Sequence, residues 1–247
     1  MRPLSAQAIV RAWELGQMQH PIDRALTVLC IALPGRTRAE LAVLPLSQRD
    51  RLLLQVREAT FGAMMRALTA CRGCGERVEF EIRTDSLRQL HAGTEEHALT
   101  LESGDVHLCL RLPNSLDMAA AATCGPDQDG ERLLFERCVV EAQATDGGTL
   151  EAAHLPRVLQ EAAEARLADL DPLLDVTFEV GCSACGVRWT VPLDIAAYLW
   201  AELAAEARRL LAEVHVLARS YGWREADILG MSPLRRRSYL EMVGASA

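Results

Sequence analysis

The sequence predicts an α+β fold that is mostly helical, with a small antiparallel β part organised around a discontinuous four-cysteine zinc ribbon. Half of the 247 residues are hydrophobic but only 4% are aromatic, and runs of alanine, leucine and arginine favour helix over sheet. Two copies of a Cys-x-x-Cys-Gly motif, residues 71–75 and 182–186, are each followed by a run typical of a strand. A chain of this length can form one large domain or two small ones.

Residues 1–70 are predicted to form an N-terminal helical region. Ser5 can cap a first helix, and a second apolar segment over 22–33 stops at Pro34, because proline disfavours continuation of a helix. A third helix is expected to lead directly into Cys71. Its apolar residues, which recur at helical spacing, are Leu53, Val56, Phe61, Met64 and Leu68.

Residues 71–193 are predicted to form a zinc-ribbon and β region with a long α+β insertion between the two cysteine motifs. After the first motif, apolar residues over 78–82 alternate with glutamates, which is typical of a half-exposed strand. A hairpin turn is expected at Ser103-Gly-Asp105. The other predicted elements are hairpin strands at 98–101 and 106–112, helices at 114–124, 130–142 and about 150–170, and a strand at 175–180.

Residues 194–247 are predicted to form a C-terminal helical region. A long amphipathic helix is expected from Asp194 to Tyr221, where the following Gly222 suits a left-handed cap. Ser232, followed by a proline, is a typical start for a final helix.

The two cysteine motifs are predicted to bind one structural zinc ion per chain. Two intervening residues allow both thiolates of a turn to reach one tetrahedral ion, and the glycine after the second cysteine supplies the positive φ that the turn needs. A shell of four thiolates leaves no coordination position for water, so the ion would stabilise the fold without taking part in catalysis. The predicted zinc ligands are Cys71, Cys74, Cys182 and Cys185.

A redox dithiol, unmetallated thiols and an iron site are the alternatives to zinc at the cysteine motifs. A redox Cys-x-x-Cys pair normally stands at the N-terminus of a helix, which lowers the thiol pKa, whereas both pairs here lead into strand patterns. A reducing cytoplasm disfavours disulfides. The cysteines outside the motifs, which we expect to be small core residues, are Cys30, Cys109, Cys124 and Cys138.

Several classes of function are disfavoured by the sequence. The six histidines form no catalytic metal motif, and there is neither a nucleophile elbow nor a phosphate-binding glycine loop. The formal net charge of -8 repels phosphate backbones, and no apolar run is long enough to cross a bilayer. We therefore expect a soluble, cytoplasmic protein that is not an enzyme, with no small-molecule substrate, no nucleic-acid partner and no membrane partner.

The C-terminal segment contains candidate partner-binding residues. Three successive arginines on a helix point in different directions, so only part of the triplet can face one partner. Ion pairs within this acidic protein or with an acidic partner protein are favoured over contacts with nucleic acid. The aromatic residues can pack either within the protein's own helical hairpin or on an assembly partner. The candidates are Tyr221, Trp223, Arg235, Arg236, Arg237, Tyr239 and Leu240.

The segment 217–240 resembles a family of phage-tail-related proteins, the T-even-type baseplate hub assembly-chaperone or baseplate proteins of contractile injection systems. Arg24-Ala-Leu, residues 57–62 and both cysteine motifs share in this resemblance. It covers most of the chain, with a looser match over about 83–175.

The resemblance implies a non-enzymatic baseplate component or assembly chaperone that binds hub or wedge proteins of a phage tail-like particle. Such a protein would act in the cytoplasm or be incorporated into the assembled particle. The alternative is a zinc-ribbon regulatory or nucleic-acid-associated adaptor, which would need a basic surface stripe. A metallohydrolase would need an open coordination position at the cysteine site.

Overall fold

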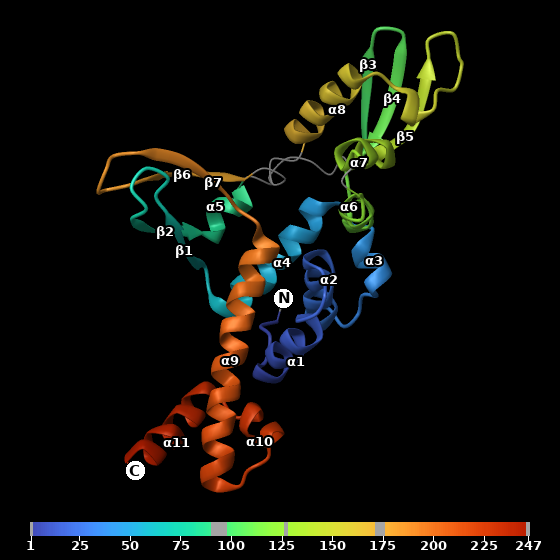
Figure 1. Ribbon diagram of the computed structural model, residues 1–247. Helices are drawn as coiled ribbons and strands as arrows, with labels where there is room; N and C mark the ends of the chain where they lie inside the picture. Colours follow the sequence, from blue (N-terminus) through green and yellow to red (C-terminus); the bar gives the residue numbers. More distant parts are fainter. Residues whose placement is uncertain (1, 90–97, 126–127, 171–175, 246–247) are drawn as a thin grey trace. The chain divides into compact units, whose positions relative to one another are not determined.

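The computed structural model describes residues 2–89, 98–125, 128–170 and 176–245 (Figure 1). Helices predominate, and the described strands form small antiparallel sheets, which confirms the predicted α+β class. The chain divides into two compact units, and neither is continuous in sequence. Unit 1 comprises Met1–Arg38, Leu53–Gly62 and Asp194–Ala247, and unit 2 comprises Ala39–Leu52 and Ala63–Leu193. The sequence-based division at residues 70 and 193 stays a prediction.

Unit 1 is helical and is built around the long helix α9 (Ile195–Tyr221). Helices α1, α2, α10 and α11 all pack against α9. The side chains that α9 buries include Leu199, Leu203, Leu210 and Leu217, on the apolar face expected from the sequence. The other helices of this unit are α1 (Ala6–Gly16), α2 (Pro21–Ala32), the second part of α4 (Leu46–Phe61), α10 (Glu225–Gly230) and α11 (Pro233–Ala245).

The predicted ends of these helices are confirmed by their capping contacts. Ser5 Oγ accepts a hydrogen bond from the Ala8 amide at 3.2 Å, and the Asp194 carboxylate accepts one from Ala197 at 2.9 Å. Helix α9 ends at Gly222, whose φ of 70° is the left-handed conformation that glycine adopts without steric cost. These contacts satisfy backbone groups that a helix cannot pair internally.

The prediction that a helix leads directly into Cys71 is wrong, because a strand precedes this cysteine. Helix α4 ends at Phe61, Gly62 turns the chain with a φ of 92°, and β1 (Met64–Ala70) follows. Spacing of Met64 and Leu68 by four residues fits a helix, but β1 alternates between exposed and more buried positions. It pairs with β2 (Arg77–Arg83) over its whole length, and the pairing buries Met65 opposite Ile82. Tertiary pairing therefore overrides the helical spacing here.

The insertion in unit 2 contains a three-stranded antiparallel sheet in the order β3-β4-β5. Strands β3 (Ala98–Ser103) and β4 (Val106–Arg111) form the predicted hairpin. The core of this part consists of Leu99, Leu108, Leu110, Phe135, Ala142, Leu155, Leu159 and Ala163. The other elements of unit 2 outside the cysteine hairpins are α3 (Arg38–Ala42), α5 (Thr84–Gln89), α6 (Ser115–Ala122), α7 (Gly130–Cys138), β5 (Val139–Ala144), a 3-10 turn (Ala152–His154) and α8 (Arg157–Leu170).

Two further predictions in the insertion are corrected. The segment 130–142 was expected to be one helix, but its last residues belong to β5, which pairs with β4. The helix expected from about residue 150 begins only at Arg157, because Leu150 still bonds to the edge of β5 and Pro156 precedes the first turn.

A buried carboxylate fixes α6 to the sheet. Asp117 is fully buried and accepts hydrogen bonds from Arg111 at 2.6 and 2.9 Å and from Arg137 at 3.0 Å. It also accepts the Asn114 amide at 3.0 Å, while Asn114 caps the helix in return. In the described part of the chain, no helix is long and apolar enough to span a membrane.

Candidate metal centre

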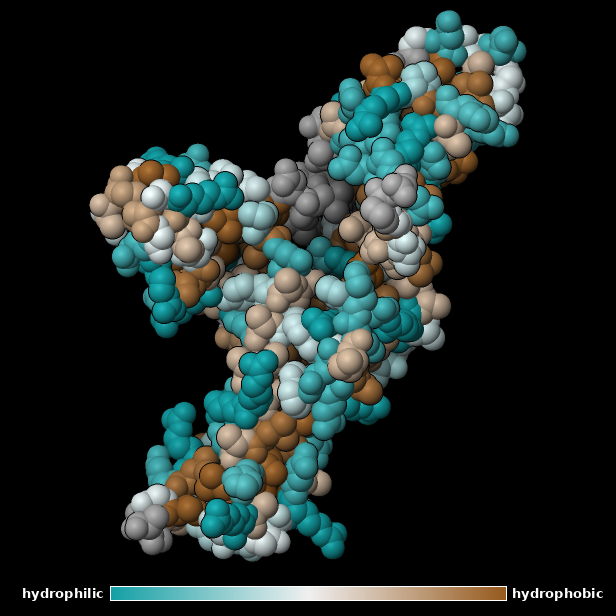
Figure 2. All heavy atoms as spheres, in the orientation of Figure 1, coloured by the Kyte–Doolittle hydropathy of each residue, from teal (hydrophilic) through white to brown (hydrophobic). Residues whose placement is uncertain are grey.

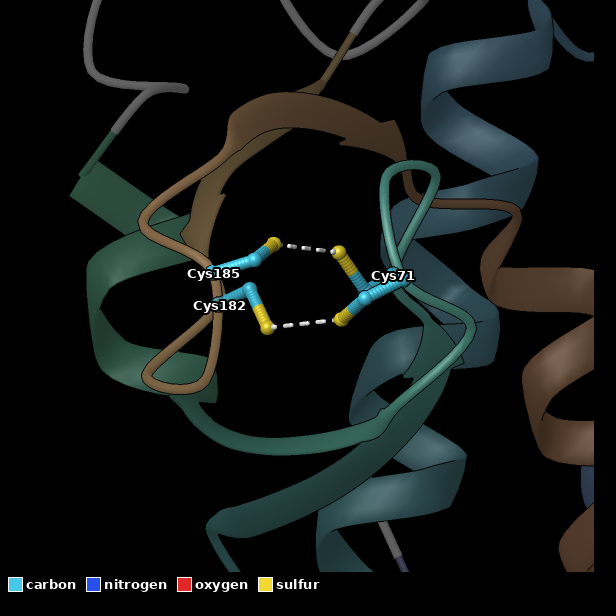
Figure 3. Close-up of side chains that lie close together, drawn as sticks. Cys71, Cys182 and Cys185 are labelled. Atoms are coloured by element: carbon cyan, nitrogen blue, oxygen red, sulfur yellow. Dashed lines mark hydrogen bonds between the residues drawn. The ribbon is translucent and has the colours of Figure 1, made fainter.

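Four cysteine thiols from two β-hairpins converge in unit 2 (Figure 3). The first hairpin is β1–β2, and the second is formed by β6 (Thr177–Gly181) and β7 (Arg188–Pro192). Each hairpin carries one cysteine motif at its turn. The sulfur atoms of Cys71, Cys74, Cys182 and Cys185 all lie within 4.8 Å of one another. The structure thus brings together all four residues that the sequence predicted as metal ligands.

The spacing of the sulfur atoms fits a tetrahedral metal ion. Cys71 and Cys185 Sγ are 3.5 Å apart, and Cys74 and Cys182 Sγ are 3.6 Å apart. A disulfide would need about 2.05 Å, whereas four thiolates at a Zn–S distance of about 2.3 Å stand roughly 3.8 Å apart. Both short distances join one hairpin to the other. An ion at this position would therefore cross-link segments that lie 108 residues apart in sequence.

The two motifs fold as matching turns. In the first, the Gly75 amide donates to the Cys71 carbonyl at 2.9 Å, and in the second, Gly186 donates to Cys182 at 2.9 Å. Gly75 and Gly186 have φ values of 78° and 76°, as the sequence predicted. The first cysteine of each motif is buried and the second is exposed. This repetition gives the site two equivalent halves.

The surroundings of the turns shift the pKa values of the thiols in opposite directions. Amide donors from Cys74 and Gly73 lower the pKa of Cys71 to about 6. The amide of Glu76 favours the thiolate of Cys74, but the neighbouring thiols of Cys185 and Cys182 raise its pKa to about 12. Several thiolates this close repel one another, and a bound cation removes that cost. The donor set is therefore suited to a divalent ion whose binding releases thiol protons.

The absence of a side chain at Gly73 lets the two turns approach closely. A methyl group on this residue would lie 2.9 Å from Val187 Cγ2 and 3.4 Å from Cys185 Sγ. Behind the sulfurs, Val180 and Trp189 form a small buried cluster with two of the cysteines. Sequence reasoning missed the role of Gly73, because a glycine inside the motif gives no signal of a close approach from a distant segment.

The surroundings of both motifs argue against a redox dithiol. Redox cysteine pairs use the N-terminus of a helix to stabilise the thiolate. Here each pair lies between two antiparallel strands.

The strand before the first motif, β1, was missed in the sequence. Residues 64–70 alternate in burial but not in polarity, so their sequence gives no strand signal.

Residues 19–199 match the family described as "T4 bacteriophage base plate protein". The chain belongs to this family. The match includes both cysteine motifs and stops before the end of α9. Neither a curated protein nor a solved structure matches the chain. The predicted resemblance is thereby confirmed at the level of a phage baseplate protein.

The predicted partner-binding residues of this base plate family member lie in unit 1. Tyr221 stacks on Trp223 with ring centroids 4.4 Å apart, and Tyr239 meets Trp223 edge-on at 4.8 Å. Arg235 lies 5.7 Å from the Tyr239 ring. Arg236 is buried and donates to Glu213 at 2.9 Å and to the Met231 carbonyl at 2.6 Å. Arg237 is exposed and Leu240 is half-buried.

The four cysteines outside the motifs have different surroundings in this base plate protein. Cys138 is buried at the end of α7, and burial raises the pKa of its thiol to about 11. Such a thiol is poorly reactive at neutral pH. Cys30, Cys109 and Cys124 are half-buried.

Proposed function

We propose that the protein is a non-enzymatic component or assembly chaperone of the baseplate in a phage tail-like contractile injection system. The family match over residues 19–199 carries this proposal. Its partners are other baseplate proteins, from the hub or the wedges, which it meets in the cytoplasm during assembly. It either leaves after assembly or is incorporated into the particle.

The metal centre fits a structural role within that function. We infer one zinc ion per chain, bound by Cys71, Cys74, Cys182 and Cys185, because four thiolates in tetrahedral reach form the typical structural zinc shell. Such a shell has no open position at which water or substrate could bind. A metallohydrolase would need that position.

The charge of the zinc ribbon argues against the nucleic-acid adaptor. Residues 64–83 and 177–192 together contain five arginines and four glutamates, so the ribbon carries almost no net charge. The whole chain has a net charge of -8. A phosphate backbone gains little electrostatic attraction from such a surface.

Affinity purification and gene deletion test the proposed function. A tagged copy of the full chain, expressed in cells that produce the particle, is expected to co-purify hub or wedge proteins. Deletion of the gene is expected to abolish complete sheathed particles in electron micrographs. Normal particle numbers from the deletion strain would refute the proposal.

A further inference from the structure

The C-terminal helices of unit 1 present a surface of aromatic rings, exposed apolar side chains and an exposed arginine. We propose that it binds an acidic segment of another baseplate protein, in which carboxylates flank an aromatic or aliphatic side chain. The inference rests on the proposed function and adds to it the docking face and the chemistry of its occupant. This aromatic–arginine surface comprises Tyr221, Trp223, Leu234, Arg235, Tyr239 and Met242.

The aromatic residues of this surface are already ordered by one another. Tyr221 and Trp223 stack with an interplanar angle of 14°, and Tyr239 stands edge-on to both, at 5.7 Å from Tyr221 and 4.8 Å from Trp223. Tyr221 is exposed and the other two rings are half-buried. Rigid, partly exposed tyrosine and tryptophan side chains lose little conformational entropy on binding, which is why they often dominate binding energy at interfaces.

Helix α11 extends the aromatic cluster with exposed apolar side chains. Arg235, Tyr239 and Met242 stand at positions i, i+4 and i+7, which share one flank of a helix. Met242 is 56% exposed, and Leu234 in the first turn is 75% exposed. Figure 2 shows hydrophobic side chains gathered where α11 lies along α9. Exposed apolar side chains that gather on a surface are typical of sites of protein interaction.

The charge beside the cluster selects an acidic occupant. The Arg235 guanidinium lies against the Tyr239 ring and is exposed, without a salt bridge to another residue of the described chain. Arg224, directly after Trp223, is likewise exposed and makes no ion pair within the described residues. A guanidinium that stacks on an aromatic ring can still bind a carboxylate through two parallel hydrogen bonds.

Two other arginines of these helices differ from Arg235, because each is paired with a glutamate. Arg236, one residue further on, is buried and paired with Glu213, and Arg209 pairs with Glu206 and Glu213. Arg236 thus joins α11 to α9 and Arg209 pairs within α9, whereas the guanidinium of Arg235 is available to a partner. Nucleic acid is disfavoured as that partner, because a phosphate backbone needs an extended basic stripe, whereas this surface offers two arginines on a protein of net charge -8.

Helix α11 offers a matched control for Arg235. Arg237 is also exposed, but two residues correspond to about 200° around the helix axis, so it lies on the opposite flank. Arg235→Glu and Arg237→Glu change the net charge of the protein equally. Only the first replaces a residue of the aromatic–arginine surface. Thermal unfolding and zinc content are expected to be unchanged in both variants, because both side chains are exposed.

The test uses the full chain in a deletion strain that produces particles only when complemented. A photo-crosslinking amino acid is placed at position 242, on the flank of Arg235, alone or together with Arg235→Glu or Arg237→Glu, and the crosslinked peptides are identified by mass spectrometry. We expect one crosslink, to an acidic segment of another baseplate protein. Its yield should fall at least fivefold with Arg235→Glu and less than twofold with Arg237→Glu.

Three crosslinking results would overturn the inference: equal yields from the two variants, crosslinks to a second copy of this chain, or crosslinks to nucleic acid. The proposed function is judged separately by co-purification with the wild-type chain. Baseplate proteins that co-purify with wild type and with Arg235→Glu to the same extent would leave the function standing and reject this surface.

Discussion

At Gly73 the two cysteine turns approach so closely that a side chain does not fit beside Val187 and Cys185. We predict that Gly73→Ala separates the turns, weakens metal binding and lowers the free energy of unfolding by about 1–3 kcal/mol, the usual cost of overpacking. Chelator competition and denaturant unfolding measure the two effects. Gly35→Ala is the control, because a methyl group there meets no atom within 4 Å. Equal behaviour of the two variants would contradict the close approach.

Asp117 makes stability depend on pH. Burial by itself raises the pKa of its carboxyl group, but hydrogen bonds from Arg111 and Asn114 outweigh burial, so the pKa in the folded protein is lowered. Its contribution is therefore fully present above the unfolded value of about 3.9 and is lost as the pH falls through the folded pKa.

We predict that Asp117→Asn lowers the free energy of unfolding by about 1–3 kcal/mol at pH 7, since charged hydrogen bonds become neutral ones. The difference between variant and wild type should shrink below about pH 4. Urea unfolding of both proteins across this pH range measures it. A difference that stays constant with pH would show that Asp117 is not ionised in the folded protein.

Among the elements, those whose ends are set by local chemistry were predictable from the sequence. Ser5, Asp194 and Gly222 act within one turn of their own helix, so their residue types reveal helix ends. Strands β1 and β5 were missed, because each follows a helix with at most two residues between them and is stabilised by pairing with another strand. Apolar residues spaced by four, such as Met64 and Leu68, fit a helix until that pairing is known.

In the candidate site too, features set by local sequence could be predicted, and features set by contacts between distant segments could not. Motif spacing was enough to predict that the four thiols come together, because Cys-x-x-Cys turns have few stable uses. That they bind zinc stays a prediction. The hairpin form of each half, and the contact of Gly73 with Val187, depend on how two distant segments meet. A single sequence holds no direct record of such a contact.

Helices α4 and α9 are joined by a buried ion pair. Arg57 is 2% exposed and donates to both carboxylate oxygens of Glu202, at 2.8 and 2.7 Å, and to the Gly62 carbonyl at 2.6 Å. We predict that Arg57→Ala lowers the free energy of unfolding by about 3–5 kcal/mol, since it leaves a partly buried carboxylate unpaired.

Chemical denaturation of the purified chain measures that loss. Arg66→Ala provides the comparison, because Arg66 also pairs with a glutamate, Glu81, but its side chain is 85% exposed. An exposed pair contributes at most about 1 kcal/mol. Similar losses in the two variants would mean that burial of Arg57 does not strengthen the link between the helices.

At the scale of the whole molecule, both compact units are built from separated parts of the chain. In unit 2, the two cysteine hairpins flank the insertion in sequence. A metal ion bound between them would therefore close a loop of more than a hundred residues. Closing such a loop removes conformational entropy from the unfolded chain, as a cross-link does. The hydrophobic cluster behind the sulfurs is small, so the ribbon is expected to depend on its ion.

The most direct test of the shared metal centre is the zinc content of the purified full-length chain, measured by mass spectrometry of the metal, for wild type, Cys71→Ser, Cys182→Ser and the control Cys124→Ser. We predict one zinc ion per chain in wild type and in the control. In the Cys71 and Cys182 variants we predict loss of zinc together with β-sheet signal in circular dichroism. Full zinc content in both of these variants would contradict the claim that the two hairpins hold one ion between them.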